Sequence, residues 1–166
     1  MNQKKSHCHP ERNYFLLPSN DMIINNTKSF LTIKVIWKDD PMFEIEVSAC
    51  NKRYFGLTEV YDTTESLSSF AKQLKGFPDG RNSLFYEAGE KDSYSYFSME
   101  FSLISPSGQV GVLIHLEENV STEYRDGEKD KLKLEVIVEP SAIDNFQKEL
   151  LRLALKEEGE ATLNGI

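Results

Sequence analysis

The feature that most constrains this fold is a two-residue alternation of apolar side chains, which recurs in several segments of the chain. Alternation with this period places successive side chains on opposite faces of a β-strand. Turn-forming residues such as Pro41 and Gly108 separate consecutive segments, as in antiparallel hairpins. The pattern therefore predicts an antiparallel sheet of about seven strands, near residues 30–37, 42–49, 53–61, 83–88, 94–104, 109–117 and 131–139.

Two hairpins have a predicted register. Placing Trp37 opposite Phe43 makes the apolar faces of the first two strands coincide, and it also sets Lys34 opposite Glu46. Opposite charges that face each other across two strands stabilise the pair. A four-residue turn over residues 105–108 likewise aligns Phe101 with Val112 and Ser98 with His115.

The facing of residues 53–61 has two solutions. A simple turn after Asn51 points Thr58 and Val60 inward and sets Glu44 opposite Glu59, an unfavourable pair of like charges. A β-bulge inverts the assignment. The sequence leaves both solutions open.

Two segments carry the apolar stripe of an amphipathic helix. The first segment is residues 63–75. Asp62 is the expected N-cap, and Glu65 follows it at capping-box spacing. Gly76 comes directly after the segment, where a left-handed cap is expected. The second segment is residues 141–156, where Ser141 and Asp144 again have capping-box spacing. Because the strands offer one consistently apolar face, the predicted fold is α+β, with an antiparallel sheet and two helices packed on one face. Phe101 and Phe146 are predicted core residues.

The chain is interpreted as one domain. Residues 1–20 are polar and aperiodic and are predicted to form a flexible N-terminal arm. Residues 22–24, which follow the arm, are a candidate for a short edge strand. Residues 21–157 form the single α+β domain, and residues 158–166 are expected to be a C-terminal tail. No internal repeat or interdomain linker is visible.

Charge and cysteine content limit the partners. The 166 residues carry a formal net charge of −8, which repels nucleic-acid phosphates and anionic lipids and attracts a basic partner. Cys8 and Cys50 are too few for a disulfide scaffold. No apolar stretch has the length of a signal peptide or of a membrane span, so a cytoplasmic location is expected. The sequence does not define an oligomeric state.

No motif commits the chain to catalysis. His7, Cys8 and His9 are consecutive and lack the rigid four-ligand spacing of structural zinc, so no metal and no cofactor are expected. Adjacent carboxylates such as Asp39–Asp40 and Glu117–Glu118 are interpreted as solvated rather than as an acid–base pair. Phosphate-binding glycine patterns and a nucleophile elbow are absent from the sequence. The balance favours a protein that is not an enzyme.

Side chains that point away from the core on two neighbouring strands form a candidate partner-binding site. Alternation in strands 94–104 and 109–117 places six residues on the face opposite the core, with aromatic anchors and acidic neighbours that suit a basic partner. They are Tyr94, Tyr96, Glu100, Leu113, His115 and Glu117. The expected register sets Tyr96 across from Glu117, and Glu100 across from Leu113. Ile36, Ile137 and, in one facing, Phe55, Leu57 and Tyr61 share the outward phase.

Several short motifs over about residues 28–155 resemble small uncharacterised bacterial proteins grouped near the WapI-type immunity proteins. They are Trp37-Lys38-Asp39-Asp40, Tyr54-Phe55-Gly56, Val60-Tyr61-Asp62, the helix through Phe70 and Leu74, Gly76-Phe77-Pro78, and residues 138–146 with the helix that follows. The asparagine–tryptophan–leucine element of the WapI-type proteins is not matched, and Ile36-Trp37-Lys38 stands nearby. The resemblance implies an immunity role and transfers no functional residue.

The leading hypothesis is a non-enzymatic protein-binding module, in its specific form an immunity protein that occludes a basic toxin such as a nuclease. Two alternatives stay open: a small-ligand-binding domain with a pocket between sheet and helices, and an enzyme with an unrecognised site. A deep pocket with convergent polar groups would favour either alternative. A flat acidic and aromatic face would favour protein binding.

Overall fold

Eight strands form two antiparallel sheets in the computed structural model, which describes residues 28–119 and 130–166. Sheet A has the order β3 (Phe55–Asp62), β2 (Met42–Asn51), β1 (Ser29–Asp39) and β8 (Glu160–Asn164). Sheet B has the order β4 (Ser83–Gly89), β5 (Ser95–Leu103), β6 (Val110–Glu118) and β7 (Asp130–Val138). The helices are α1 (Thr64–Leu74) and α2 (Pro140–Lys156).

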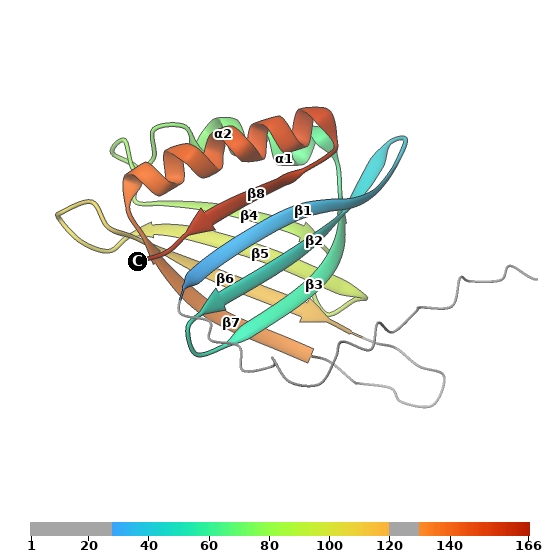
Figure 1. The fold of residues 1–166 in the computed structure, drawn as a ribbon, viewed down its shortest axis with the longest axis horizontal. Helices are drawn as coiled ribbons and strands as arrows, with labels where there is room; N and C mark the ends of the chain where they lie inside the picture. The colour runs from blue at the N-terminus through green and yellow to red at the C-terminus, as the bar shows by residue number, and fades with distance from the viewer. Residues whose placement is uncertain (1–27, 120–129) are drawn as a thin grey trace, which may run out of the picture.

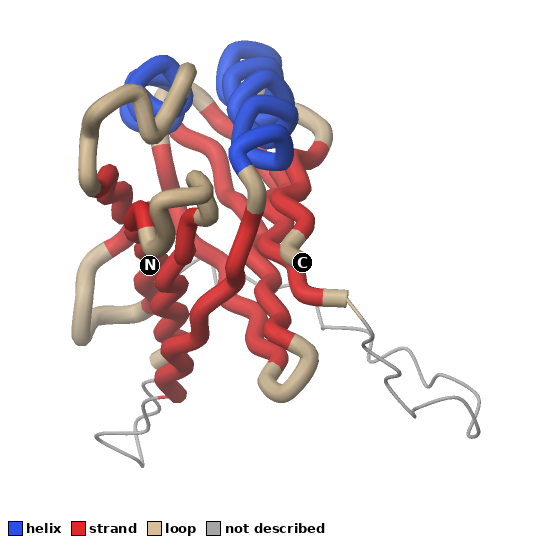
Figure 2. Tube along the Cα trace, turned by 90° about the vertical axis from the view of Figure 1, so that its left-hand side faces the viewer, coloured by secondary structure: helices blue, strands red, loops and turns tan. Residues whose placement is uncertain are grey.

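The two sheets face each other, and the two helices lie side by side along one end of the pair (Figures 1 and 2). Helix α2 contacts β8 at the edge of sheet A, while α1 contacts β4 at the edge of sheet B. The helices therefore cover the side where these two sheet edges lie (Figure 1). Apolar side chains from both sheets and both helices make one continuous core.

The α+β class and the antiparallel pairing are confirmed, but the strands are divided between two sheets. After β3 the chain enters α1, and it then starts a second set of antiparallel strands instead of extending the first. The apolar face that the alternation predicted is thus two inner faces turned toward each other.

The C-terminal segment 158–166 differs from the predicted tail because it contains β8. This strand pairs antiparallel with β1, and it buries Ala161 and Leu163 in the core. Left-handed backbone at Glu157 (φ 52°) and Gly159 (φ 88°) turns the chain back from α2. The period-two signal is only five residues long, which is why the sequence pattern did not reveal it.

The first hairpin contains a β-bulge. Lys34 pairs with Glu46 as expected, but the register shifts between Val35 and Trp37. Trp37 consequently pairs with Glu44 rather than with Phe43, so the predicted Trp37–Phe43 pairing is wrong. The extra residue turns the Trp37 side chain away from the core, and 47% of it is exposed.

The facing of β3 follows the simple-turn solution: Thr58 and Val60 point inward and are fully buried. The turn is longer than two residues, and the side chain of Asn51 accepts hydrogen bonds from the backbone N–H groups of Arg53 and Tyr54. Its length pairs Glu46, rather than Glu44, with Glu59. Phe55, Leu57 and Tyr61 lie on the outer face.

The helix starts differ from the capping boxes read in the sequence. Thr63 rather than Asp62 is the N-cap of α1, and its side chain accepts a hydrogen bond from the Ser66 N–H. Asp62 is buried and accepts a hydrogen bond from the Tyr86 hydroxyl. Helix α2 has Glu139 at its N-cap without a side-chain hydrogen bond, since Pro140 begins the helix one residue before Ser141. Gly76 adopts the expected left-handed backbone, with φ of 76°.

Phe101 and Phe146 are fully buried, which confirms their predicted place in the core. The centroid of the Phe101 ring lies 6.0 Å from that of Phe70 in α1 and 6.2 Å from that of Phe77. Sheet B is thereby held directly against the helix layer.

Candidate functional site

The register predicted for the outer face of sheet B is correct. Tyr96 pairs with Glu117, Glu100 with Leu113, and Ser98 with His115. Tyr94 is 76% exposed and Leu113 is 43% exposed, while Glu100 is half-buried.

Three of the six predicted contact residues are not exposed. Tyr96, His115 and Glu117 are buried, with exposed fractions of 5%, 7% and 0%. Their expected role as surface contacts is therefore corrected. The strand period gives the correct face, but it does not show what covers that face.

A network of polar contacts around Glu117 contributes to this burial. The backbone N–H of Asp92, in the turn between β4 and β5, donates to Glu117 Oε2 at 3.0 Å. On the other oxygen, Lys131 Nζ lies at 3.1 Å and His115 Nε2 at 3.0 Å. Asn119 Nδ2 in turn donates to the Ser93 carbonyl at 2.5 Å. These contacts hold the turn against β6 and β7.

The pKa shifts fit a structural role for this network. Burial raises the pKa of Glu117, but hydrogen bonds from Asp92, Lys131 and Asn119 outweigh it and lower the pKa. Burial and the nearby Lys133 ammonium lower the pKa of His115 more than the Glu117 carboxylate raises it. Glu117 is thus ionised and His115 neutral at neutral pH.

We expect His115 to make stability depend on pH. Its pKa is lower in the folded chain than the ordinary value of 6.5, so the unfolded chain binds more protons between these two values. The resulting stabilisation is present above about pH 6.5 and is lost as the pH falls through the folded-state pKa of His115. His115→Asn should therefore lose less free energy of unfolding than the parent between about pH 7.5 and pH 5.5 in urea titrations. Equal losses in both proteins would show that His115 is not responsible.

The outer face of sheet A carries a row of three neighbouring side chains that the sequence did not place together. Trp37 of β1 pairs with Glu44 of β2, which pairs with Tyr61 of β3. The rings of Trp37 and Tyr61 meet edge to face, with centroids 6.2 Å apart and planes at 90°. Both side chains remain about half exposed, at 47% and 50%. We call these three residues the Trp37–Glu44–Tyr61 row.

A second row on the same face is rich in carboxylates. Glu59 lies opposite Glu46, Glu46 opposite Lys34, and Lys34 opposite Glu160. Like charges directly opposite each other on neighbouring strands destabilise a sheet. Glu46 and Glu59 therefore give this face negative potential at some expense of stability.

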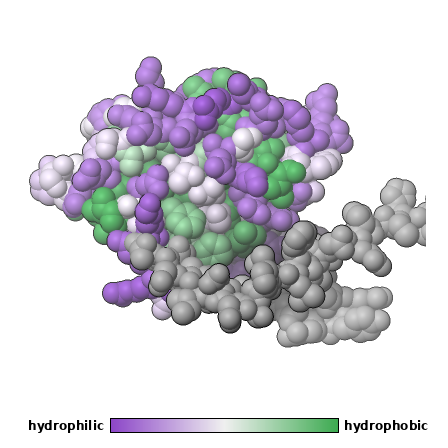
Figure 3. All heavy atoms as spheres, viewed as in Figure 1, coloured by the Kyte–Doolittle hydropathy of each residue, from purple (hydrophilic) through white to green (hydrophobic). Residues whose placement is uncertain are grey.

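Exposed apolar side chains flank both rows. Figure 3 views the molecule from the side of sheet A and shows hydrophobic residues intermixed with hydrophilic ones. The exposed apolar residues on or beside this face are Ile36, Met42, Tyr54, Phe55 and Leu57. A mixture of aromatic, apolar and acidic groups is typical of a surface that binds another protein.

Other kinds of site have less support in the described part of the chain. A groove of about 450 Å³ lies between α2 and β8, and one of about 240 Å³ lies along the seam between β3 and β7. The residues described as lining these two grooves include no histidine or cysteine. Within residues 28–119 and 130–166 there is no cluster of His, Cys, Asp and Glu suited to a metal ion. His7, Cys8 and His9 lie outside the described residues.

The helices in the described ranges also include none that is long and apolar enough to cross a bilayer. The sequence matches no protein-family model, and comparisons with curated proteins and with solved structures find no significant match.

Proposed function

We propose that this chain is a non-enzymatic protein-binding module that holds a basic protein against the outer face of sheet A. The observation that carries the proposal is the half-exposed aromatic pair Trp37 and Tyr61, which flanks Glu44 beside the opposed carboxylates of Glu46 and Glu59. Tryptophan and tyrosine are enriched among residues that dominate binding energy. Surrounding carboxylates speed the encounter with a positively charged partner.

The more specific form of this proposal is an immunity protein that acts in the cytoplasm and blocks a basic toxin. The net charge of −8 supports attraction of such a partner. The resemblance to proteins near the WapI-type immunity proteins points the same way. Occlusion requires only a complementary surface, and the acidic and aromatic outer face of sheet A would supply one to a basic toxin.

Ligand binding between sheet and helices has weaker support. Fully buried side chains such as Phe97, Met99 and Phe146 fill the space between the sheets and the helix layer. The grooves described above lie instead on outer surfaces, where they are open to solvent.

The electrostatic part of the proposal predicts a kinetic change. If the chain is an immunity protein, a toxin gene directly upstream would encode its partner, so the product of that gene is the protein to test. Glu46→Gln/Glu59→Gln should slow association with it by about threefold to tenfold at low salt, and should reduce the salt dependence. Dissociation should change little, because rim carboxylates act mainly on the encounter. The free protein should not be destabilised, since the change removes an opposed pair of like charges. Surface plasmon resonance at two salt concentrations measures both rate constants.

A matched control separates the face from the net charge. Glu135→Gln/Glu139→Gln removes the same charge at two exposed positions outside sheet A. It should leave association close to that of the parent. If both double variants slow association equally, net charge rather than sheet A guides the partner, and unchanged association in both would contradict the proposal.

A further inference from the structure

The β-bulge in β1 builds the Trp37–Glu44–Tyr61 row. In a regular hairpin Trp37 would share the inward phase of Val35, but the shift in register brings it beside Glu44 on the outer face. Bulges commonly redirect a side chain at a functional position. Adjacent strands lie about 4.8 Å apart, so Glu44 is within reach of the aromatic residues on both neighbouring strands.

The chemistry of this row matches one kind of side chain. An aromatic ring attracts a cation over its face, and a carboxylate accepts two parallel N–H bonds from a planar guanidinium. Arginine satisfies both requirements at once, because its planar group stacks on a ring and presents a fork of donors. The lysine ammonium is a strongly hydrated point charge that stacks poorly.

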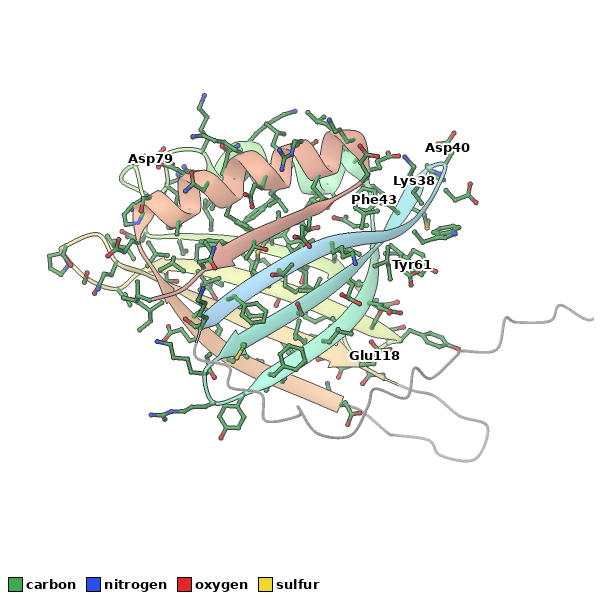
Figure 4. All side chains as sticks on the ribbon, viewed as in Figure 1. Lys38, Asp40, Phe43, Tyr61, Asp79 and Glu118 are labelled. Carbon is green, nitrogen blue, oxygen red and sulfur yellow. The ribbon has the colours of Figure 1, made fainter. Side chains whose placement is uncertain are left out.

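The surroundings of the row add to this match. Burial raises the pKa of Tyr61, and the neighbouring Glu44 carboxylate and the charge of Glu59 raise it further, because both carboxylates oppose a negative charge on the phenol. Figure 4 shows Tyr61 at the end of sheet A from which the hairpin carrying Lys38 and Asp40 projects. About half of each aromatic side chain remains accessible to a ligand.

We propose that the Trp37–Glu44–Tyr61 row is an arginine-recognition site, in which an arginine side chain of the partner stacks on the aromatic pair and forms a two-point contact with Glu44. This inference rests on the proposed function and adds the residue type that the partner must present. A carboxylate has about four acceptor sites, so Glu44 can bind the guanidinium while keeping its contacts within the protein.

The test uses the intrinsic fluorescence of Trp37, the one tryptophan of the chain. The full-length protein is titrated with acetylated and amidated hexa-arginine, and separately with the corresponding hexa-lysine peptide. Hexa-arginine should change the Trp37 emission and bind about threefold or more tightly than hexa-lysine. Glu44→Gln should remove this difference, while Glu135→Gln, at an exposed position on β7 of sheet B, should preserve it.

The possible outcomes distinguish this inference from the proposed function. Equal affinity for the two peptides, or a difference that survives Glu44→Gln, would overturn arginine recognition and leave the binding of a basic protein intact. No change in Trp37 emission with either peptide would also overturn it. The proposed function fails separately, if Glu46→Gln/Glu59→Gln leaves association with the protein partner unchanged.

Discussion

Replacement of Phe146 by alanine is expected to lower the free energy of unfolding by about 3–5 kcal/mol, and Phe101→Ala by a similar amount. Both side chains are fully buried, one from α2 and one from β5. Each truncation removes apolar surface and leaves a cavity that a close-packed core refills only partly. A loss of this size is a large part of the stability of an ordinary domain.

Urea or guanidinium melts followed by far-ultraviolet circular dichroism measure this loss. Phe85→Ala is the matched control, because Phe85 lies on β4 with 55% of its side chain exposed. It should cost less than about 1 kcal/mol. A loss below about 1 kcal/mol for Phe146→Ala would contradict the packing of α2 against the sheets.

The second large effect is expected on binding. Trp37→Ala/Tyr61→Ala should raise the rate of dissociation from the protein partner by about 30-fold, which corresponds to about 2 kcal/mol. These rings meet edge to face on the outer surface, where a bound partner would exclude water from both. Losing such anchors shortens the lifetime of a complex more than it slows the encounter.

Stability should change little in this double variant, because about half of each side chain is already exposed. Circular dichroism melts check that the effect on binding does not arise from unfolding. Dissociation within about twofold of the parent would contradict a role for the aromatic pair.

The alternation of apolar residues predicted the strands well, because most of the strands are long enough for the two-residue period to repeat several times. The β5–β6 register was also predictable, since the turn over residues 105–108 fixes the loop length. The division into two sheets was not, because alternation shows which side chains face a core but not which strand edges hydrogen-bond. The residues of β8 gave too short a pattern to separate from a tail.

The candidate site shows a different limit of sequence patterns. The period placed Tyr96, His115 and Glu117 on the correct face, but contacts from the turn at Asp92 and from Lys131 bury Glu117 there. One extra residue in β1 had the opposite effect at Trp37 and moved it from the predicted core to the surface. A bulge leaves little trace in the hydrophobic pattern, so the aromatic row emerged only from the folded register.

The most direct test of the account asks which sheet holds the partner. Trp37→Ala/Tyr61→Ala on sheet A is compared with Tyr94→Ala/Leu113→Ala, which truncates one exposed aromatic residue next to β5 and one exposed apolar residue on β6 of sheet B. Dissociation rates from the upstream gene product are measured by surface plasmon resonance under identical conditions. The account predicts about 30-fold faster dissociation for the sheet A variant and nearly parental dissociation for the sheet B variant. Faster dissociation of the sheet B variant alone would contradict it and move the binding surface to Tyr94 and Leu113.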